Sequence, residues 1–177
     1  FFDIPVDNLT AAPVFAPHIQ ERFEGERLCI VSPDVGGVVR ARHLAKRLGA
    51  DLAIIDKRRE KAGVSEVMHV IGEVDGKVCI LVDDIVDSGG TLCNAASALI
   101  EHGAKQVHSY VVHGVLSGNA VEKVEKSPME SLVITDSICV REDVADSKSV
   151  IPLSVAPLFG EGVLRTAEER SISALFK

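Results

Sequence analysis

The sequence has no segment suited to cross or enter a membrane. Apolar runs such as VCILV at residues 78–82 are far shorter than the ~20 residues that span a bilayer. The first ten residues, FFDIPVDNLT, lack the basic start and the long apolar core of a signal peptide. We therefore expect a soluble, cytoplasmic protein that has no membrane partner.

Metal-ligand and redox spacings are absent as well. The four cysteines are widely separated, with no C-x-x-C pair and no histidines near them at metal-binding spacing. Cys29 and Cys79 fall within apolar runs, where reduced thiols behave as small buried hydrophobes. The histidines are scattered and are each expected to be surface or hydrogen-bonded side chains; they include His43, His102, His108 and His113.

Positive charge is scarce in this chain. There are 19 Lys and Arg residues against 26 Asp and Glu, which gives a net charge of -7. Nucleic-acid backbones and anionic membranes attract clustered basic residues, so neither is expected as the main partner, and a small ligand is favoured. A chain of 177 residues with 46% apolar residues has the size of one domain with a sizeable core.

Several motifs of nucleotide-binding and hydrolytic enzymes are also missing. The sequence has no G-x-x-x-x-G-K-[ST] P-loop, no G-x-G-x-x-G dinucleotide fingerprint and no G-x-S-x-G elbow. The segment DDIVDSGG lacks the spacing and the terminal Glu of an EF-hand. Aromatic residues make up only 4% of the chain, and no group of them could stack a nucleobase.

What the sequence does contain is a strand–loop–helix unit that is used twice. The apolar run LCIVS ends in PDVGG, and VVRARHLAKRL follows with helical spacing up to Gly49. The run KVCILV leads through DDIVDSGGT into LCNAASALIEH, whose helical pattern stops at Gly103. Further strands are expected at residues 51–56, 64–72, 106–112, 132–135 and 149–154, and further helices at 119–126 and 156–169.

Nearly continuous apolar strands that alternate with helices predict an α/β fold, a mostly parallel sheet flanked by helices. Right-handed crossovers would place both glycine loops at the carboxyl edge of the sheet, where such folds bind ligands. The strands at 64–72 and 77–82 are expected to be joined by an Asp75-Gly76 turn. Residues 1–20 contain three prolines and are expected to form an irregular arm or linker ahead of a domain at 21–177.

The segment VDDIVDSGGT at residues 82–91 is the best candidate for binding chemistry. Its glycines can expose backbone N–H groups at a helix start, and its hydroxyls add donors, which suits a phosphate. A plain turn whose own Asp or Ser caps the helix would have the same composition, so both interpretations stay open on the turn alone. The residues concerned are Asp87, Ser88, Gly89, Gly90 and Thr91.

Asp83 and Asp84 favour the ligand interpretation, because a capping turn has no use for two carboxylates directly after a buried strand. Carboxylates accept hydrogen bonds from paired sugar hydroxyls, so a sugar phosphate would satisfy both parts of the segment. In the other loop, Asp34 could take magnesium and its glycines allow close backbone approach. The run KRR is either a solvated charge run or part of a mobile loop whose Lys57 and Arg59 close over a polyphosphate.

These residues resemble a known family. VDDIVDSGGT is similar to the ribose-phosphate loop of type I phosphoribosyltransferase folds. Over nearly the whole chain, the sequence resembles the carboxyl-terminal half of the ribose-phosphate pyrophosphokinases, also called phosphoribosyl diphosphate synthetases. The segments that carry this resemblance are FFDIPVDNL, IVSPDVGGVVRAR, DLAIIDKRR and HGVLSGNAVEKV.

The resemblance implies transfer of the pyrophosphoryl group of MgATP to the 1-hydroxyl of ribose 5-phosphate, with AMP as the second product. It implies that Asp83 and Asp84 meet the ribose hydroxyls and that Asp34 is linked to the Mg²⁺ of ATP. Lys57 and Arg59 would be basic residues of a catalytic loop. The 5-phosphate would be surrounded by Asp87, Ser88, Gly89, Gly90 and Thr91.

The resemblance also implies partners beyond this chain. The family enzymes have an amino-terminal domain that supplies much of the adenine pocket, and they form homo-oligomers, with a hexamer expected for the full length. Ser171 and Ser173 match a region associated with a regulatory phosphate site, whereas Thr10 stands where a Tyr is expected. Two alternatives stay open: a phosphoribosyltransferase acting on a base, and a non-catalytic regulatory homologue.

Overall fold

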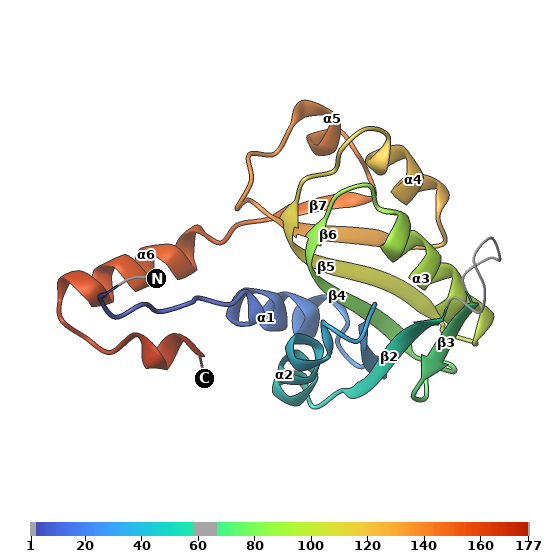
Figure 1. Ribbon diagram of the computed structural model, residues 1–177, viewed down its shortest axis with the longest axis horizontal. Helices are drawn as coiled ribbons and strands as arrows, with labels where there is room; N and C mark the ends of the chain where they lie inside the picture. The colour runs from blue at the N-terminus through green and yellow to red at the C-terminus, as the bar shows by residue number, and fades with distance from the viewer. Residues whose placement is uncertain (1–2, 59–66, 177) are drawn as a thin grey trace.

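The computed structural model describes residues 3–58 and 67–176, and a seven-stranded sheet forms its centre (Figure 1). The strand order is β3-β2-β1-β4-β5-β6-β7. All neighbouring strands run parallel except β2 and β3, so the expected mostly parallel sheet is confirmed. The strands are β1 (Leu28–Ser32), β2 (Asp51–Arg58), β3 (Val67–Ile71), β4 (Val78–Val86), β5 (Gln106–Gly114), β6 (Ser131–Thr135) and β7 (Val150–Leu153).

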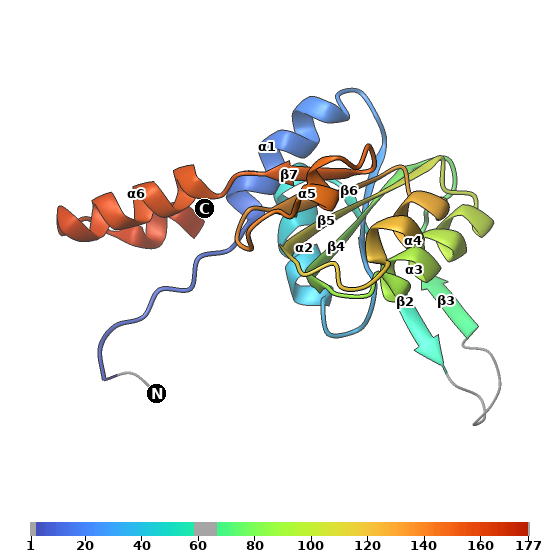
Figure 2. The same ribbon diagram turned by 90° about the horizontal axis from the view of Figure 1, so that it is seen from above.

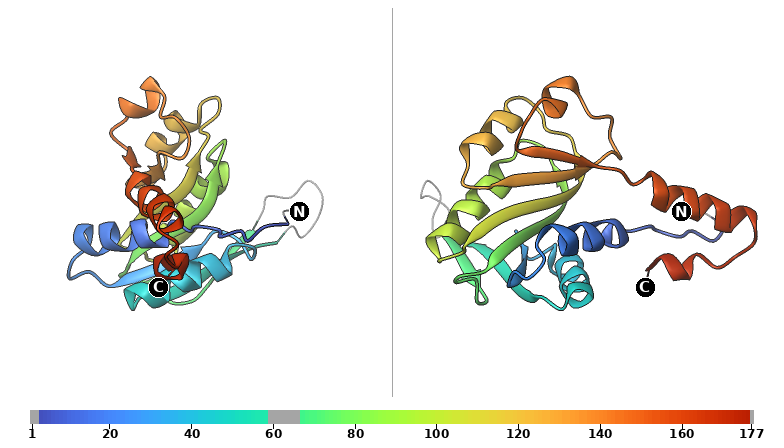
Figure 3. Two further views of the ribbon diagram at one scale, coloured as in Figure 1. Left: turned by 90° about the vertical axis from the view of Figure 1, so that its left-hand side faces the viewer. Right: turned by 180° about the vertical axis from the view of Figure 1, so that it is seen from behind.

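Helices cover both faces of the sheet (Figure 2). One face carries α1 (Ala12–Arg22) and α2 (Val38–Leu48), and the other carries α3 (Gly90–Glu101), α4 (Ala120–Lys126) and the short α5 (Glu142–Ala145). The last elements, α6 (Ala156–Ala167) and the 3-10 helix η1 (Ile172–Phe176), project away from the sheet (Figure 3). No helix within the described part of the chain has the length and apolar character needed to span a membrane.

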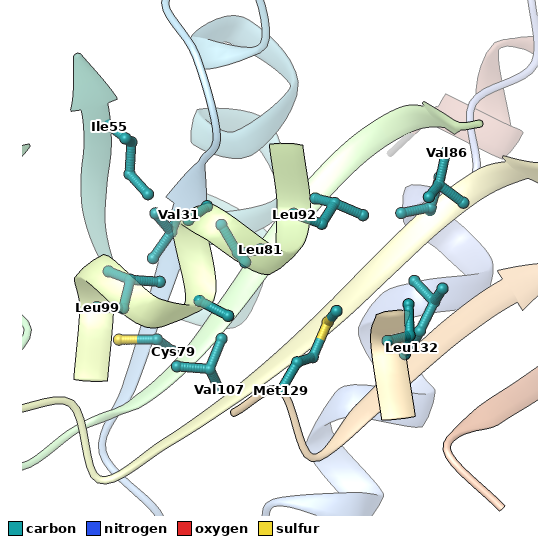
Figure 4. Packing of buried hydrophobic residues seen from close by; sticks show 14 of the residues in the cluster. Val31, Ile55, Cys79, Leu81, Val86, Leu92, Leu99, Val107, Met129 and Leu132 are labelled. Carbon is teal, nitrogen blue, oxygen red and sulfur yellow. The ribbon is translucent and has the colours of Figure 1, made fainter. Parts of the chain in front are cut away.

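The core forms because the central strands are apolar on both faces. In β4, Cys79 and Leu81 face the layer of α3, whereas Ile80 and Val82 face α1 and α2. Leu92 and Leu99 of α3 pack over the first of these sides (Figure 4). A strand buried on both faces cannot slip by one residue without exposing apolar side chains, and this fixes the register that positions the loops.

Residues 12–20 form most of α1, so the expected irregular conformation was wrong for this part of the arm. Pro13 lies in the first turn, where a helix needs no hydrogen bond from its nitrogen. Pro17 lies inside the helix, at a cost of about 3 kcal/mol. Phe15 and Ile19 are almost fully buried, which stabilises the helix by about 1.5–3 kcal/mol each. Burial of these side chains therefore outweighs the local preference against a helix.

The segment from β3 to β4 corrects a second expectation. Both strands exist and Gly76 has the positive φ of a turn, but the two strands are not neighbours, because β2 and β1 lie between them. β3 instead pairs antiparallel with β2, with Ile55 opposite Val70. The cause is burial: β4 is apolar on both sides and takes the centre, whereas β3 exposes residues such as His69 and takes the edge.

Candidate functional site

Two loops meet at the carboxyl edge of the sheet because β1 and β4 are parallel neighbours (Figure 1). The register pairs Val31 with Leu81, so both strands end at the same side. The β1–α2 loop at residues 33–37 and the β4–α3 loop at residues 87–89 therefore leave the sheet together. This is the arrangement that the repeated strand–loop–helix unit predicts.

The β4–α3 loop is a helix start without a side-chain cap. Gly89 occupies the N-cap of α3 with φ of 75°, and within the described residues no side chain, including those of Asp87 and Ser88, caps this helix. The interpretation of this loop as a capped turn is therefore not what the structure shows. The open first turn of a twelve-residue helix, with exposed Ser88 and Thr91 beside it, can receive an anion.

Residues that follow β5 in the chain donate hydrogen bonds to this loop. The N–H of Ser117 donates to the carbonyl of Asp87 over 3.1 Å, and Lys123 Nζ donates to the carbonyl of Ser88 over 3.4 Å. Gly89 is buried, and its carbonyl accepts the N–H of Cys93 at 3.0 Å. The carbonyls of all three loop residues thus accept hydrogen bonds, which fixes the backbone conformation before any ligand binds.

A guanidinium joins the two carboxylates of Asp83 and Asp84, which lie within β4. The sequence predicted a position directly after this strand, whereas the structure shows both residues inside it. Arg40 of α2 lies with Nη1 3.1 Å from Asp83 Oδ1 and with Nη2 3.1 Å from Asp84 Oδ2. The N–H of Asp84 also donates to Asp83 Oδ1 over 2.9 Å. Sequence reasoning did not single out Arg40. A signal was available, because a basic residue in the first turn of a helix opposes the helix dipole and therefore suggests an acidic partner.

The two carboxyls differ in proton affinity because they differ in burial. Only 15% of the Asp83 side chain is exposed, and burial, with the neighbouring Asp84 carboxylate, raises the pKa of Asp83 to about 6 despite the Asp84 N–H and Arg40. Asp84 is 61% exposed. Burial acts to raise the pKa of Asp84, but the hydrogen bond with Asp83 and the charge of Arg40 outweigh it, so this pKa is lowered.

The β1–α2 loop places Asp34 close to the same arginine. Asp34 Oδ1 accepts the N–H of Gly37 over 2.8 Å, and Ser32 Oγ donates to the Asp34 carbonyl over 2.7 Å. A Cβ on Gly37 would lie 2.8 Å from Ser32 Oγ, 3.5 Å from Asp34 Oδ1 and 3.6 Å from Arg40 Nη1. Glycine is therefore needed for this close approach, which brings Asp34 and Arg40 near the same backbone position.

The comparisons with known proteins identify the family of this fold. The family model described as the phosphoribosyl transferase domain matches residues 10–147. The chain belongs to the phosphoribosyl transferase domain family. Its fold is similar to the crystal structure of phosphoribosylpyrophosphate synthetase from Mycobacterium smegmatis, with a TM-score of 0.86 and 36% identity over 95% of this chain and 54% of that one. The expected type I phosphoribosyltransferase fold is thus confirmed.

Curated relatives within the phosphoribosyl transferase domain family carry a specific name. Proteins named ribose-phosphate pyrophosphokinase from Granulibacter bethesdensis and Hyphomonas neptunium are 61% and 59% identical to this chain. Each match covers 99% of this chain and 57% of the relative. The chain therefore spans a little over half the length of these relatives. Their shared name does not favour the base-transferring alternative.

Of the two basic residues expected in this phosphoribosyl transferase domain, the structure describes one. Lys57 is half-buried and lies in β2 opposite Met68 of β3. The sequence predicted a loop at this position, whereas the structure shows a strand. β2 runs parallel to β1, which brings Lys57 to the same edge of the sheet as Asp34. Arg59 lies outside the described residues.

Ser171 and Ser173 follow the projecting helix α6 near the end of the chain. Both are exposed, and the N–H of Ser173 donates to Ser171 Oγ over 3.2 Å. Arg165 Nη1 donates to the carbonyl of Ser171 over 3.0 Å. Thr10 is exposed just ahead of α1. The 3-10 helix η1, which contains Ser173, lies away from the sheet (Figure 1).

The remaining titratable groups lie outside the two loops. Cys29 and Cys79 are buried and free, as the sequence predicts, and they pair in register on β1 and β4. His108 is buried with Nδ1 2.8 Å from Ser131 Oγ, but its Nε2 has no hydrogen-bond partner among the residues that the structure describes. In the described ranges, no three His, Cys, Asp or Glu residues are grouped to hold a metal ion. A surface hollow of about 420 Å³ contains none of the expected site residues; it is lined by Gly118, Asn119, Val121, Glu122, Glu125, Asp146 and Ser147.

Proposed function

We propose that this chain is the sugar-phosphate-binding part of a ribose-phosphate pyrophosphokinase, which transfers the pyrophosphoryl group of MgATP to ribose 5-phosphate. The identity of 55–61% to eight curated proteins of that name supports the proposal. The observation that carries it is the paired carboxylates of Asp83 and Asp84, which stand beside an uncapped helix start. The products would be phosphoribosyl diphosphate and AMP.

The two ends of ribose 5-phosphate match the two chemistries of this edge. The uncapped N–H groups at the start of α3 and the hydroxyls of Ser88 and Thr91 would receive the 5-phosphate, with Gly89 and Gly90 allowing close approach. Asp83 and Asp84 would accept hydrogen bonds from the vicinal hydroxyls of the ribose. The sugar would then lie across the loop with its 1-hydroxyl directed away from the phosphate cradle.

The transfer needs the charge on ATP and on departing AMP to be balanced. Asp34 is exposed, and only one of its carboxylate oxygens accepts a hydrogen bond from the described residues, so its other oxygen could bind Mg²⁺. Bound there, Mg²⁺ would orient the phosphates and neutralise developing charge. Lys57 and Arg59 would stabilise the transferred group as the ribose 1-hydroxyl attacks the β-phosphorus.

A complete enzyme would need more than this chain. The relatives are nearly twice as long, which supports an additional amino-terminal domain that completes the ATP site. Phe159 and Val163 on the projecting helix α6 are more than half exposed, as expected of a surface that packs against further protein. We infer a homo-oligomer, hexameric at full length. Ser171 and Ser173 would contribute part of a regulatory phosphate site.

Calorimetric titration with ribose 5-phosphate in the presence of Mg²⁺ tests the proposal. We expect one sugar phosphate per chain, and binding weakened at least tenfold by Asp84→Ala, which removes a charged acceptor. Asp75→Ala is the matched control, because Asp75 is also exposed but lies before β4, at the opposite end of that strand. Absence of binding, or an equal effect of both variants, would contradict the proposal. With MgATP present, phosphorus NMR should show poor turnover by this chain alone.

A further inference from the structure

Arg40 engages each carboxylate of the acidic pair through a different oxygen. Its two terminal nitrogens lie 3.1 Å from Asp83 Oδ1 and from Asp84 Oδ2. A planar guanidinium can span two acceptors in this way, because its N–H groups are fixed in a fork. The side chain is 33% exposed, so this contact is partly shielded from solvent.

The oxygens that Arg40 leaves open match the number of hydroxyls in a vicinal diol. Asp83 Oδ1 accepts from both Arg40 and the Asp84 N–H, whereas Asp83 Oδ2 accepts from no donor in residues 3–58 or 67–176. Arg40 likewise leaves Asp84 Oδ1 open, because its Nη2 lies beside Oδ2. Each carboxylate therefore keeps one acceptor oxygen, and the fork of Arg40 sets the spacing between the two.

Arg40 also offsets the crowding of negative charge at this edge. Two adjacent carboxylates repel each other, and Asp34 adds a third across Gly37. Without a cation between them, the side chains of Asp83 and Asp84 would separate or turn toward solvent. The side chain of the exposed Arg42, two residues further along α2, has no hydrogen bond or ion pair with any described residue. The guanidinium of Arg40 is thus held by two ion pairs, whereas that of Arg42 is not.

Resting on the proposed function, we propose that Arg40 is a positioning residue that determines sugar specificity. Its guanidinium holds Asp83 and Asp84 so that their two open oxygens accept the paired 2- and 3-hydroxyls of a ribose phosphate. It acts through the carboxylates and does not itself contact the sugar. Removing the fork should therefore weaken recognition of the diol more than binding of the phosphate.

Two ligands separate these effects: ribose 5-phosphate and 2-deoxyribose 5-phosphate, which lacks one hydroxyl of the diol. We expect the unaltered chain to prefer ribose 5-phosphate by at least tenfold, since an unmet carboxylate oxygen penalises the deoxy sugar. In Arg40→Gln, the affinity for ribose 5-phosphate should fall about 30-fold and that for the deoxy sugar about threefold, so the preference nearly disappears. Arg40→Lys keeps the charge but not the fork and should lose most of the preference.

Arg42→Gln is the control, because it makes the same charge change on the same helix and should leave both affinities within a factor of two. Thermal unfolding of each variant checks that it folds, and Arg40→Lys serves if Arg40→Gln does not. An unchanged preference in a folded Arg40 variant, or tighter sugar binding, would overturn the positioning role alone. Failure of the unaltered chain to bind ribose 5-phosphate would instead overturn the proposed function.

Discussion

Arg40 Nη1 and Asp83 Oδ1 lie 3.1 Å apart, although 43 residues separate them in the chain. The contact joins the first turn of α2 to the end of β4, and so connects the two glycine loops at the sheet edge. It forms because β1 and β4 are parallel neighbours, which brings the helix after β1 against the carboxylates in the second half of β4. The acidic pair is therefore organised by the fold before any ligand is present.

The raised pKa of Asp83 predicts a stability that depends on pH. Because the folded state holds this proton up to about pH 6 and the unfolded state releases it near its usual pKa of 3.8, stability should fall as pH rises through this window. Asp83→Asn removes the effect. The variant should gain stability relative to the unaltered chain between pH 4.5 and pH 7.5, by about 2 kcal/mol at most. Thermal or denaturant unfolding at the two pH values measures this.

Asp84→Asn provides the contrast, because the pKa of Asp84 is lowered in the fold. Its ionised form stabilises the folded state above the unfolded pKa, and this contribution is lost as pH falls. The Asn variant should therefore be less stable than the unaltered chain at both pH 7.5 and pH 4.5, and the deficit should shrink only as the pH falls below the unfolded pKa of 3.8. The same sign of change in both variants would contradict these assignments.

Gly89→Ala should destabilise the chain by about 1 kcal/mol, because a side chain at φ of 75° is strained. The cause is conformational and not steric, since a Cβ there would meet its closest neighbour, the carbonyl of Ala120, at an ordinary 3.7 Å. Gly160→Ala in α6 is the control, because a Cβ there meets nothing within 4 Å and should stabilise the helix by about 0.5–1 kcal/mol. Denaturant unfolding compares them; equal effects would refute the strain.

Gly37→Ala should act through a clash with Ser32 Oγ, which would lie 2.8 Å from the new Cβ. The serine must move, and its 2.7 Å hydrogen bond to the Asp34 carbonyl would be lost. We expect destabilisation of about 1–3 kcal/mol. Adding Ser32→Ala removes the clash, so the double variant should be less destabilised than the sum of the two single changes. Additive free energies of unfolding in this cycle would exclude the clash.

Phe15→Ala tests whether α1 is part of the core. Phe15 is 2% exposed and meets Tyr110 edge to face, with ring centroids 5.4 Å apart. Its removal should cost about 3–5 kcal/mol. Gln20→Ala changes an exposed position of the same helix and should stay within about 0.5 kcal/mol. If urea unfolding shows a loss for Phe15→Ala as small as for Gln20→Ala, the helix does not contribute to the folding unit.

The repeated strand–loop–helix unit, and the sheet edge at which both glycine loops lie, follow from local patterns in the sequence. Continuous apolar runs such as residues 78–82 require burial on both faces, and parallel strands bring their carboxyl ends together. The helix stops at Gly49 and Gly103 follow equally local rules. Asp83 and Asp84 could be recognised because two adjacent charges interrupt an apolar run, although the structure places them within β4 and not after it.

Which elements lie side by side depends on packing between segments that are distant in the chain. The helix α1 forms although Pro17 lies inside it, because burial of side chains such as Phe15 outweighs the unfavourable helix propensity of proline. The partner of β3 and the approach of Arg40 to Asp83 depend on strand order. A periodic pattern reports which face of an element is buried, but not what it is buried against, because contacts between distant residues are set by packing of the whole sheet.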